Sequence, residues 1–194
     1  MEASENLAVQ VPRLWSMTME RRKKVIAFFR ELGFAIDISQ FDDRLIAQKL
    51  VCLLELRGID LGYPCNIHVR GPYSPPLADD LFDFTNEFRN LETDLQLKPA
   101  EKEAARDLGR IFGLKPVPLE IGATYGYYTR WQKNDPLEAL RRLKRLKPFY
   151  SETQIALGIS KANEFLFRPT PGDLEELSEE TGIWQRASLK TWES

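Results

Sequence analysis

The side chains that could carry out chemistry are few in this chain. Its single histidine is His68, and no second histidine, Cys-x-x-Cys pair or acidic cluster with ligand spacing accompanies it, so the ligand set of a zinc site is missing. The one serine near His68 is Ser74, which is better explained as a helix cap than as a nucleophile. No phosphate-binding loop of the GxGxxG or GxxxxGKS/T type occurs. We therefore expect a protein that is not an enzyme and that holds neither a metal nor a cofactor.

The two cysteines, Cys52 and Cys65, could form at most one disulfide. The N-terminal sequence lacks the basic start and apolar run of a signal peptide, and no stretch approaches the ~18 apolar residues of a membrane span. Disulfides are rare in the reducing cytosol. We therefore expect free thiols that fill apolar space, in a soluble cytoplasmic protein without a membrane partner.

A small polar and aromatic cluster, His68, Arg70 and Tyr73, is the candidate for partner binding. Arginine and tyrosine are common in interface hot spots, because each joins a large contact area to directional hydrogen bonding. These three residues are predicted to contact a protein partner. The alternative is that the Tyr73 ring packs against the helix that follows it.

Two basic runs are the candidates for nucleic-acid contact, one at residues 21–24 and one at 141–147. The first begins a helix, where the macrodipole disfavours positive charge, and the second ends a helix, where the dipole favours it. Solvated helix faces explain both runs more simply, and a net charge of −2 provides no global field for nucleic acid. The candidate residues are Arg21, Arg22, Lys23, Lys24, Arg141, Arg142, Lys144, Arg145 and Lys147.

A helix-turn-helix motif is suggested by Ala156 and Gly158 but fails on spacing. Only Leu157 separates these two residues, which leaves too little chain for a first helix to end. We expect one helix here, with an interior glycine.

Apolar residues at helical spacing predict a mainly α fold. The 194 residues fit a single compact helical domain of about eight helices at 18–182, with a flexible leader at 1–17 and a C-terminal tail at 183–194. The segment 119–131 is ambiguous, because it alternates like a strand but also repeats bulky residues every four positions. We favour a helix there.

One small β element is predicted, a strand near residues 64–70 in which apolar and polar residues alternate, with Val69 inward. Gly71–Pro72 would end the strand and form a turn. Ser74 is then a favourable N-cap, with Pro75 at the first helical position. We expect the strand to pack on the helix that starts at Pro75.

The segment from Arg44 to Phe88 resembles a known pattern. Its residues are Gln48-Lys49-Leu50 leading to Gly71-Pro72-Tyr73-Ser74, followed by Leu77 and Leu81. It is similar to the uncharacterised YwgA-type proteins and, more distantly, to the SocA-like antitoxin-associated domain, also called Panacea. Cys52 departs from the pattern, which commonly has an aromatic residue there. The Panacea resemblance implies a binding module that neutralises toxins by direct contact.

These observations together predict a non-enzymatic intracellular protein-binding or regulatory module, in a toxin–antitoxin, stress or mobile-element defence setting. The alternative is a nucleic-acid-binding regulator that uses the two basic runs. An enzyme ranks third.

Overall fold

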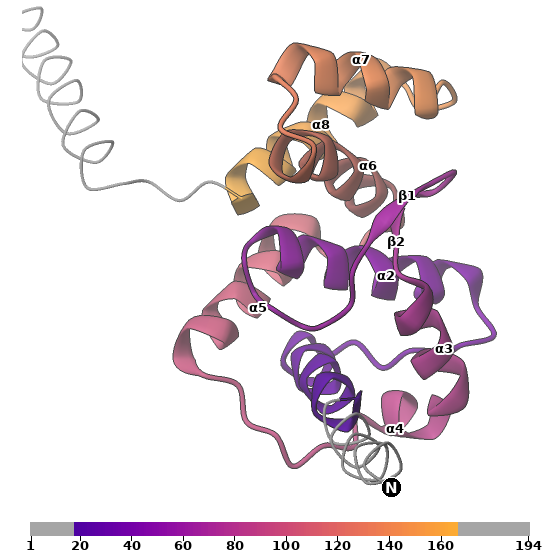
Figure 1. Ribbon diagram of the computed structural model, residues 1–194, viewed down its shortest axis with the longest axis vertical. Coiled ribbons are helices and arrows are strands. Elements are labelled where there is room, and N and C mark those ends of the chain that lie inside the picture. Colours follow the sequence, from indigo (N-terminus) through magenta and orange to yellow (C-terminus); the bar gives the residue numbers. More distant parts are fainter. Residues whose placement is uncertain (1–17, 167–194) are drawn as a thin grey trace, which may run out of the picture.

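The structure is a computed structural model that describes residues 18–166. The predictions for the leader at 1–17, the end of the domain at 167–182 and the tail at 183–194 lie outside the described residues. The described chain is mainly helical with one small antiparallel sheet, as predicted (Figure 1). A helix over residues 18–32 precedes α2 (Phe41–Leu56), β1 (Asn66–His68), β2 (Gly71–Tyr73), α3 (Pro75–Asp83), α4 (Thr85–Asn90), α5 (Pro99–Phe112), α6 (Pro116–Gly126), the π-helix η1 (Tyr127–Trp131), α7 (Pro136–Leu146) and α8 (Glu152–Leu166).

Helix α2 is central to the main core. It is buried from Leu45 to Leu54, and its apolar side packs with Phe28 of the first helix, Leu108 of α5 and Leu119 of α6. Helix α6 lies between α2 and the layer of α7 and α8 (Figure 1). A second cluster of buried residues therefore forms on its other side, around Ile121. No helix within residues 18–166 is long and apolar enough to span a membrane.

Glycines allow α6 and α8 to approach closely. A Cβ at Gly122 would lie 2.7 Å from the ring of Phe112 and 3.3 Å from the carbonyl oxygen of Gly158, and one at Gly158 would overlap Ile121. Helix α8 runs through Gly158 without a break, so the prediction of one helix with an interior glycine is confirmed. The segment 119–131 is helical as favoured, with its last five residues in η1.

The β element differs from the prediction in its strands, in the position of Val69 and in its packing. Gly71–Pro72 does not end the sheet, because these residues belong to the second strand, and the turn is made by Val69 and Arg70. The strands pair with His68 opposite Gly71. Gly71 has φ +80°, a conformation that favours glycine, and a Cβ there would overlap the Thr124 hydroxyl. The tight turn leaves Val69 68% exposed, so its predicted inward position is wrong.

The hairpin packs mainly against α2 and α6. The prediction that it packs on the helix that starts at Pro75 is therefore wrong. That helix does begin with Ser74 at the N-cap and Pro75 at the first position, as predicted. The Ser74 side chain makes no capping bond, and its hydroxyl is buried without a partner among the described residues. The Ser74 backbone instead pairs with the side chain of Gln48 on α2.

The prediction of free thiols is wrong, because Cys52 and Cys65 are joined in a disulfide with their Cα atoms 6.2 Å apart. Cys52 lies in the buried middle of α2, and Cys65 directly precedes β1. Both cysteines are buried, as expected, but the inference of a reducing compartment led to the wrong prediction of their redox state. The bond ties the hairpin covalently to α2.

Candidate binding pocket

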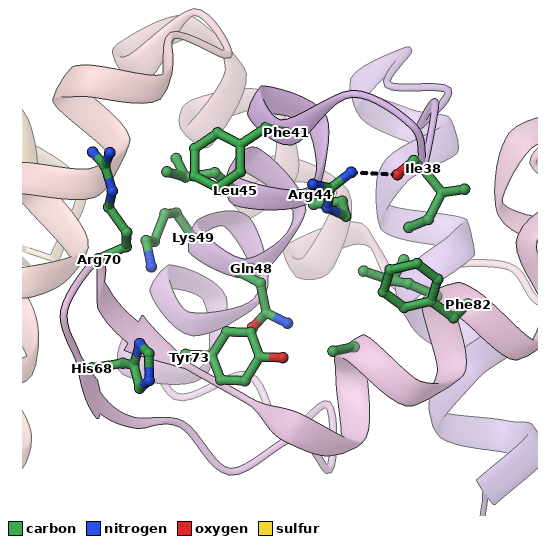
Figure 2. Close-up of a pocket in the computed structure, with 12 residues that line it drawn as sticks. Ile38, Phe41, Arg44, Leu45, Gln48, Lys49, His68, Arg70, Tyr73 and Phe82 are labelled. Carbon is green, nitrogen blue, oxygen red and sulfur yellow. Dashed lines mark hydrogen bonds between the residues drawn. The ribbon is translucent and has the colours of Figure 1, made fainter.

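A pocket of about 280 Å³ opens between α2, the β1–β2 hairpin and α3 (Figure 2). Its apolar floor is formed by Leu45 and Leu81, and two large apolar side chains stand exposed at its edge, Phe41 (51%) and Phe82 (60%). Enclosed apolar sites with a few convergent polar groups are typical of ligand-binding pockets. The full lining is Ile38, Phe41, Arg44, Leu45, Gln48, Lys49, His68, Arg70, Tyr73, Ala78, Leu81 and Phe82.

Gln48 fixes the wall between the hairpin and α3. Its amide oxygen accepts a hydrogen bond from the Ser74 backbone N–H at 2.8 Å, and its amide nitrogen donates to the Ser74 carbonyl at 3.1 Å. Gln48 is buried, and a buried polar side chain is stable only when it is hydrogen-bonded. This paired contact therefore holds the entry to α3 at a defined distance from α2.

Lys49 is the unusual residue of the pocket, because its side chain is buried with 2% of the residue exposed. Its Nζ donates to the Pro72 carbonyl at 2.5 Å. Burial lowers the pKa of Lys49 to about 7; the nearby carboxylate of Glu120 opposes this shift, and the positive charges of Lys147 and Arg70 add to it. A lysine that titrates near neutral pH inside a pocket is a common mark of a functional site.

A buried ion pair supports the hairpin turn from behind. Lys147 Nζ lies 2.5 Å from a carboxylate oxygen of Glu120 and donates to the Val69 carbonyl at 2.7 Å. The other oxygen of Glu120 is 3.7 Å from the Arg70 guanidinium. Lys147 and Glu120 are both buried, and such a pair is retained only where its partners are well placed. The pair thus fixes the turn that carries Arg70.

The three residues predicted to bind a partner, His68, Arg70 and Tyr73, all line this pocket (Figure 2). The rings of His68 and Tyr73 are 5.8 Å apart. The Arg70 guanidinium lies 5.6 Å from the ring centre of Phe41, within the range of a cation–π contact. Their role in binding stays a prediction, but the hairpin places them on one wall of one cavity.

Sequence reasoning missed Lys49 and Gln48 as site residues, although it used both in the family resemblance. A signal was present. Lys49 lies four residues after Leu45 and four before Leu53, so it occupies the apolar stripe of its helix. A lysine in that position either interrupts the apolar stripe or is buried for a functional reason.

The nine basic residues proposed for nucleic acid each have a carboxylate within 2.5 to 3.8 Å. The contacts are Arg21 with Asp80, Arg22 with Glu87, Lys23 with Asp94, Lys24 with Glu101, Arg141, Arg142 and Arg145 with Glu138, Lys144 with Glu152, and Lys147 with Glu120. The first run is therefore neutralised residue by residue. Lys147 is fully buried and lies away from any surface that a phosphate could reach.

Comparisons with protein-family models, with curated proteins and with solved structures gave no match. Within residues 18–166, no group of three or more histidine, cysteine, aspartate or glutamate side chains could hold a metal ion.

Proposed function

We propose that the protein is a non-enzymatic protein-binding module, and that its pocket receives an apolar side chain of a partner protein beside an acidic residue. The observation that carries this proposal is the composition of the lining. It combines an apolar floor with the cations Arg44, Lys49 and Arg70, and none of the lining residues within 18–166 has a carboxylate.

The edge of the pocket supports a protein as the partner. Phe41, Phe82 and Arg70 are exposed around the opening, with Arg70 54% exposed at its side chain. Aromatic residues and arginine are enriched in protein interfaces, where they supply most of the binding energy. A large apolar anchor placed in a pocket and surrounded by such residues is a common arrangement of an interface hot spot.

Charge complementarity supports an acidic segment. Three cations around a cavity without a carboxylate attract a negatively charged partner and disfavour a positively charged one. Nucleic acid would also be negative, but each residue of the first basic run has its own carboxylate. In the second run Arg141, Arg142 and Arg145 share the carboxylate of Glu138, so these three arginines are what the nucleic-acid alternative rests on. The resemblance to antitoxin-associated proteins adds a toxin as one candidate partner class, and this remains part of the proposal.

Selection from a random peptide display library tests the proposal. We expect enrichment of peptides in which aspartate or glutamate lies within two residues of a large apolar side chain. Replacing Arg70 or Tyr73 by alanine should weaken binding of the selected peptides at least fivefold without loss of fold.

Arg89→Ala is the matched control, because Arg89 is 55% exposed and lies 3.7 Å from one carboxylate, that of Asp37, as Arg70 does from Glu120. Arg89 is outside the lining, so its variant should bind as the wild type does. Peptides without acidic residues, or peptides whose binding ignores both pocket variants, would refute the proposal. If Tyr73→Ala unfolds the protein, the alternative that its ring belongs to the core is correct.

A further inference from the structure

The amine of Lys49 faces the pocket with unused hydrogen-bonding capacity. An ammonium group has three donors, and the Pro72 carbonyl is the one acceptor within hydrogen-bond distance of Lys49 Nζ among residues 18–166. The side chain leaves α2 and ends between His68, Arg70 and Tyr73 (Figure 2). Lys49 Nζ therefore has donor capacity beyond its bond to Pro72.

The charges around Lys49 indicate the sign of that group. Among residues 18–166, Glu120 on α6 is the one carboxylate that raises the pKa of Lys49, whereas the positive charges of Lys147 and Arg70 lower it. Glu120 is already bonded to Lys147 and lies beside Arg70. Three cations therefore share one carboxylate, and a second anion would balance the cluster.

We propose that this pocket binds a carboxylate carried on an apolar group, with the carboxylate held by Lys49 Nζ and the apolar group in the cavity. The inference rests on the proposed function in that the same pocket is used, and it adds the atom that recognises the ligand. A carboxylate fits because it accepts several hydrogen bonds through two oxygens.

The size of the pocket limits the apolar group. A volume of about 280 Å³ lies just below the usual range for ligand sites, which begins at about 300 Å³. It suits one large side chain or a compact arylalkyl acid. The exposed rings of Phe41 and Phe82 at the edge would cover the apolar group.

Binding of the carboxylate is linked to a proton. The pKa of Lys49 is about 7 in the free pocket because of burial, so only part of the protein holds the ammonium form that an anion prefers. A bound carboxylate raises that pKa. Affinity should therefore increase as the pH falls from 8 to 6, by about tenfold, because the binding-competent fraction rises by that factor.

Calorimetry with a matched ligand pair tests the inference. The acid 3-phenylpropionate and its neutral analogue 3-phenylpropanamide differ only at the group that Lys49 would recognise. At pH 6 we expect the acid to bind at least tenfold more tightly than the amide. At pH 7, titrations in buffers of different ionisation enthalpy should show uptake of about half a proton per bound acid.

Variants separate Lys49 from its neighbours. Lys49→Met keeps an unbranched side chain, one heavy atom shorter and without the amine, and should abolish both the preference for the acid and the pH dependence. His68→Gln replaces the imidazole that lines the pocket beside Lys49 and should keep both effects. Lys133→Met changes an exposed lysine outside the pocket and should match the wild type.

Equal binding of acid and amide, or failure to bind either at 10 mM, would overturn the inference, and so would a Lys49→Met variant that keeps the preference. The wild-type comparison alone decides the matter if Lys49→Met does not fold. If the acid binds but no acidic peptide is selected, the inference stands and the proposed protein partner falls. If acidic peptides bind independently of Lys49, the proposed function stands and this inference falls.

Discussion

Replacing Lys49 by methionine should make the protein more stable at pH 6 and remove much of the pH dependence of its stability. The pKa of Lys49 is lowered by burial from 10.5 to about 7. Between these values the unfolded chain binds a proton that the folded chain has released, so stability rises with pH in this window. Below pH 7 both states hold the proton, and the folded state bears the full cost of the buried charge.

The structure sets the size of the effect. A difference of one pKa unit corresponds to about 1.4 kcal/mol. The free energy of unfolding of the wild type should therefore rise by about 2 kcal/mol between pH 7 and pH 9, where the unfolded chain holds the Lys49 proton and the folded chain does not. Methionine removes the buried charge but also the bond to the Pro72 carbonyl, a loss of about 1 kcal/mol. We expect Lys49→Met to be about 2–4 kcal/mol more stable than the wild type at pH 6, with the difference narrowing by about 2–3 kcal/mol by pH 9.

Urea denaturation of the disulfide-bonded protein at several pH values from 6 to 9 measures this. The comparison with the variant isolates Lys49 from Lys147, whose pKa is also lowered by burial. Tyr150, whose pKa burial raises to about 12, titrates above the range. Lys133→Met serves as the surface control. Parallel curves for the wild type and Lys49→Met, or a variant that is less stable at pH 6, would refute the reasoning about the buried amine.

Three further perturbations test other parts of the structure. Gly71→Val should lower the free energy of unfolding by about 1–3 kcal/mol, because Gly71 has φ +80° and a Cβ there would overlap the Thr124 hydroxyl. A melting temperature within a degree or two of the wild type would contradict this. Replacing Cys52 and Cys65 by serine opens a bridge between residues 13 apart and should cost about 3 kcal/mol in urea denaturation, whereas an unchanged midpoint would show that the bridge does not constrain the unfolded chain. Labelled duplex DNA, single-stranded DNA and RNA should bind at most weakly near 150 mM salt, and sub-micromolar binding with a steep salt dependence that Arg142→Glu abolishes would favour the nucleic-acid alternative.

Local sequence patterns determined the helices well because their signals lie within a few residues. Asp135 shows this, since its carboxylate accepts from the N–H groups of Leu137 and Glu138, each at 3.0 Å, as an N-cap before a proline should. The second strand was missed because glycine and proline are typical of turns. Its formation depends on α6, whose Thr124 leaves room only for a residue without Cβ.

The site was predictable in part. His68, Arg70 and Tyr73 lie close together in sequence, so their chemistry drew attention before any fold was known. Lys49 joins them only through the packing of α2 against the hairpin. The charges that lower its pKa come from residues 21 to 98 positions away in the sequence, and no local pattern contains them. The disulfide was mispredicted for a different reason. The prediction relied on a reducing compartment inferred from the sequence, whereas the short distance between Cys52 and Cys65 appears only in the folded chain.

A double-mutant cycle across the binding site tests the central claim most directly. The affinities of a selected acidic peptide and its glutamate-to-glutamine or aspartate-to-asparagine form are measured at pH 6 against the wild type and Lys49→Met. If the partner's carboxylate meets the Lys49 amine, the two changes should be strongly non-additive, with a coupling energy of about 1–3 kcal/mol. A coupling energy indistinguishable from zero, with both single changes retaining their separate effects, would contradict the account.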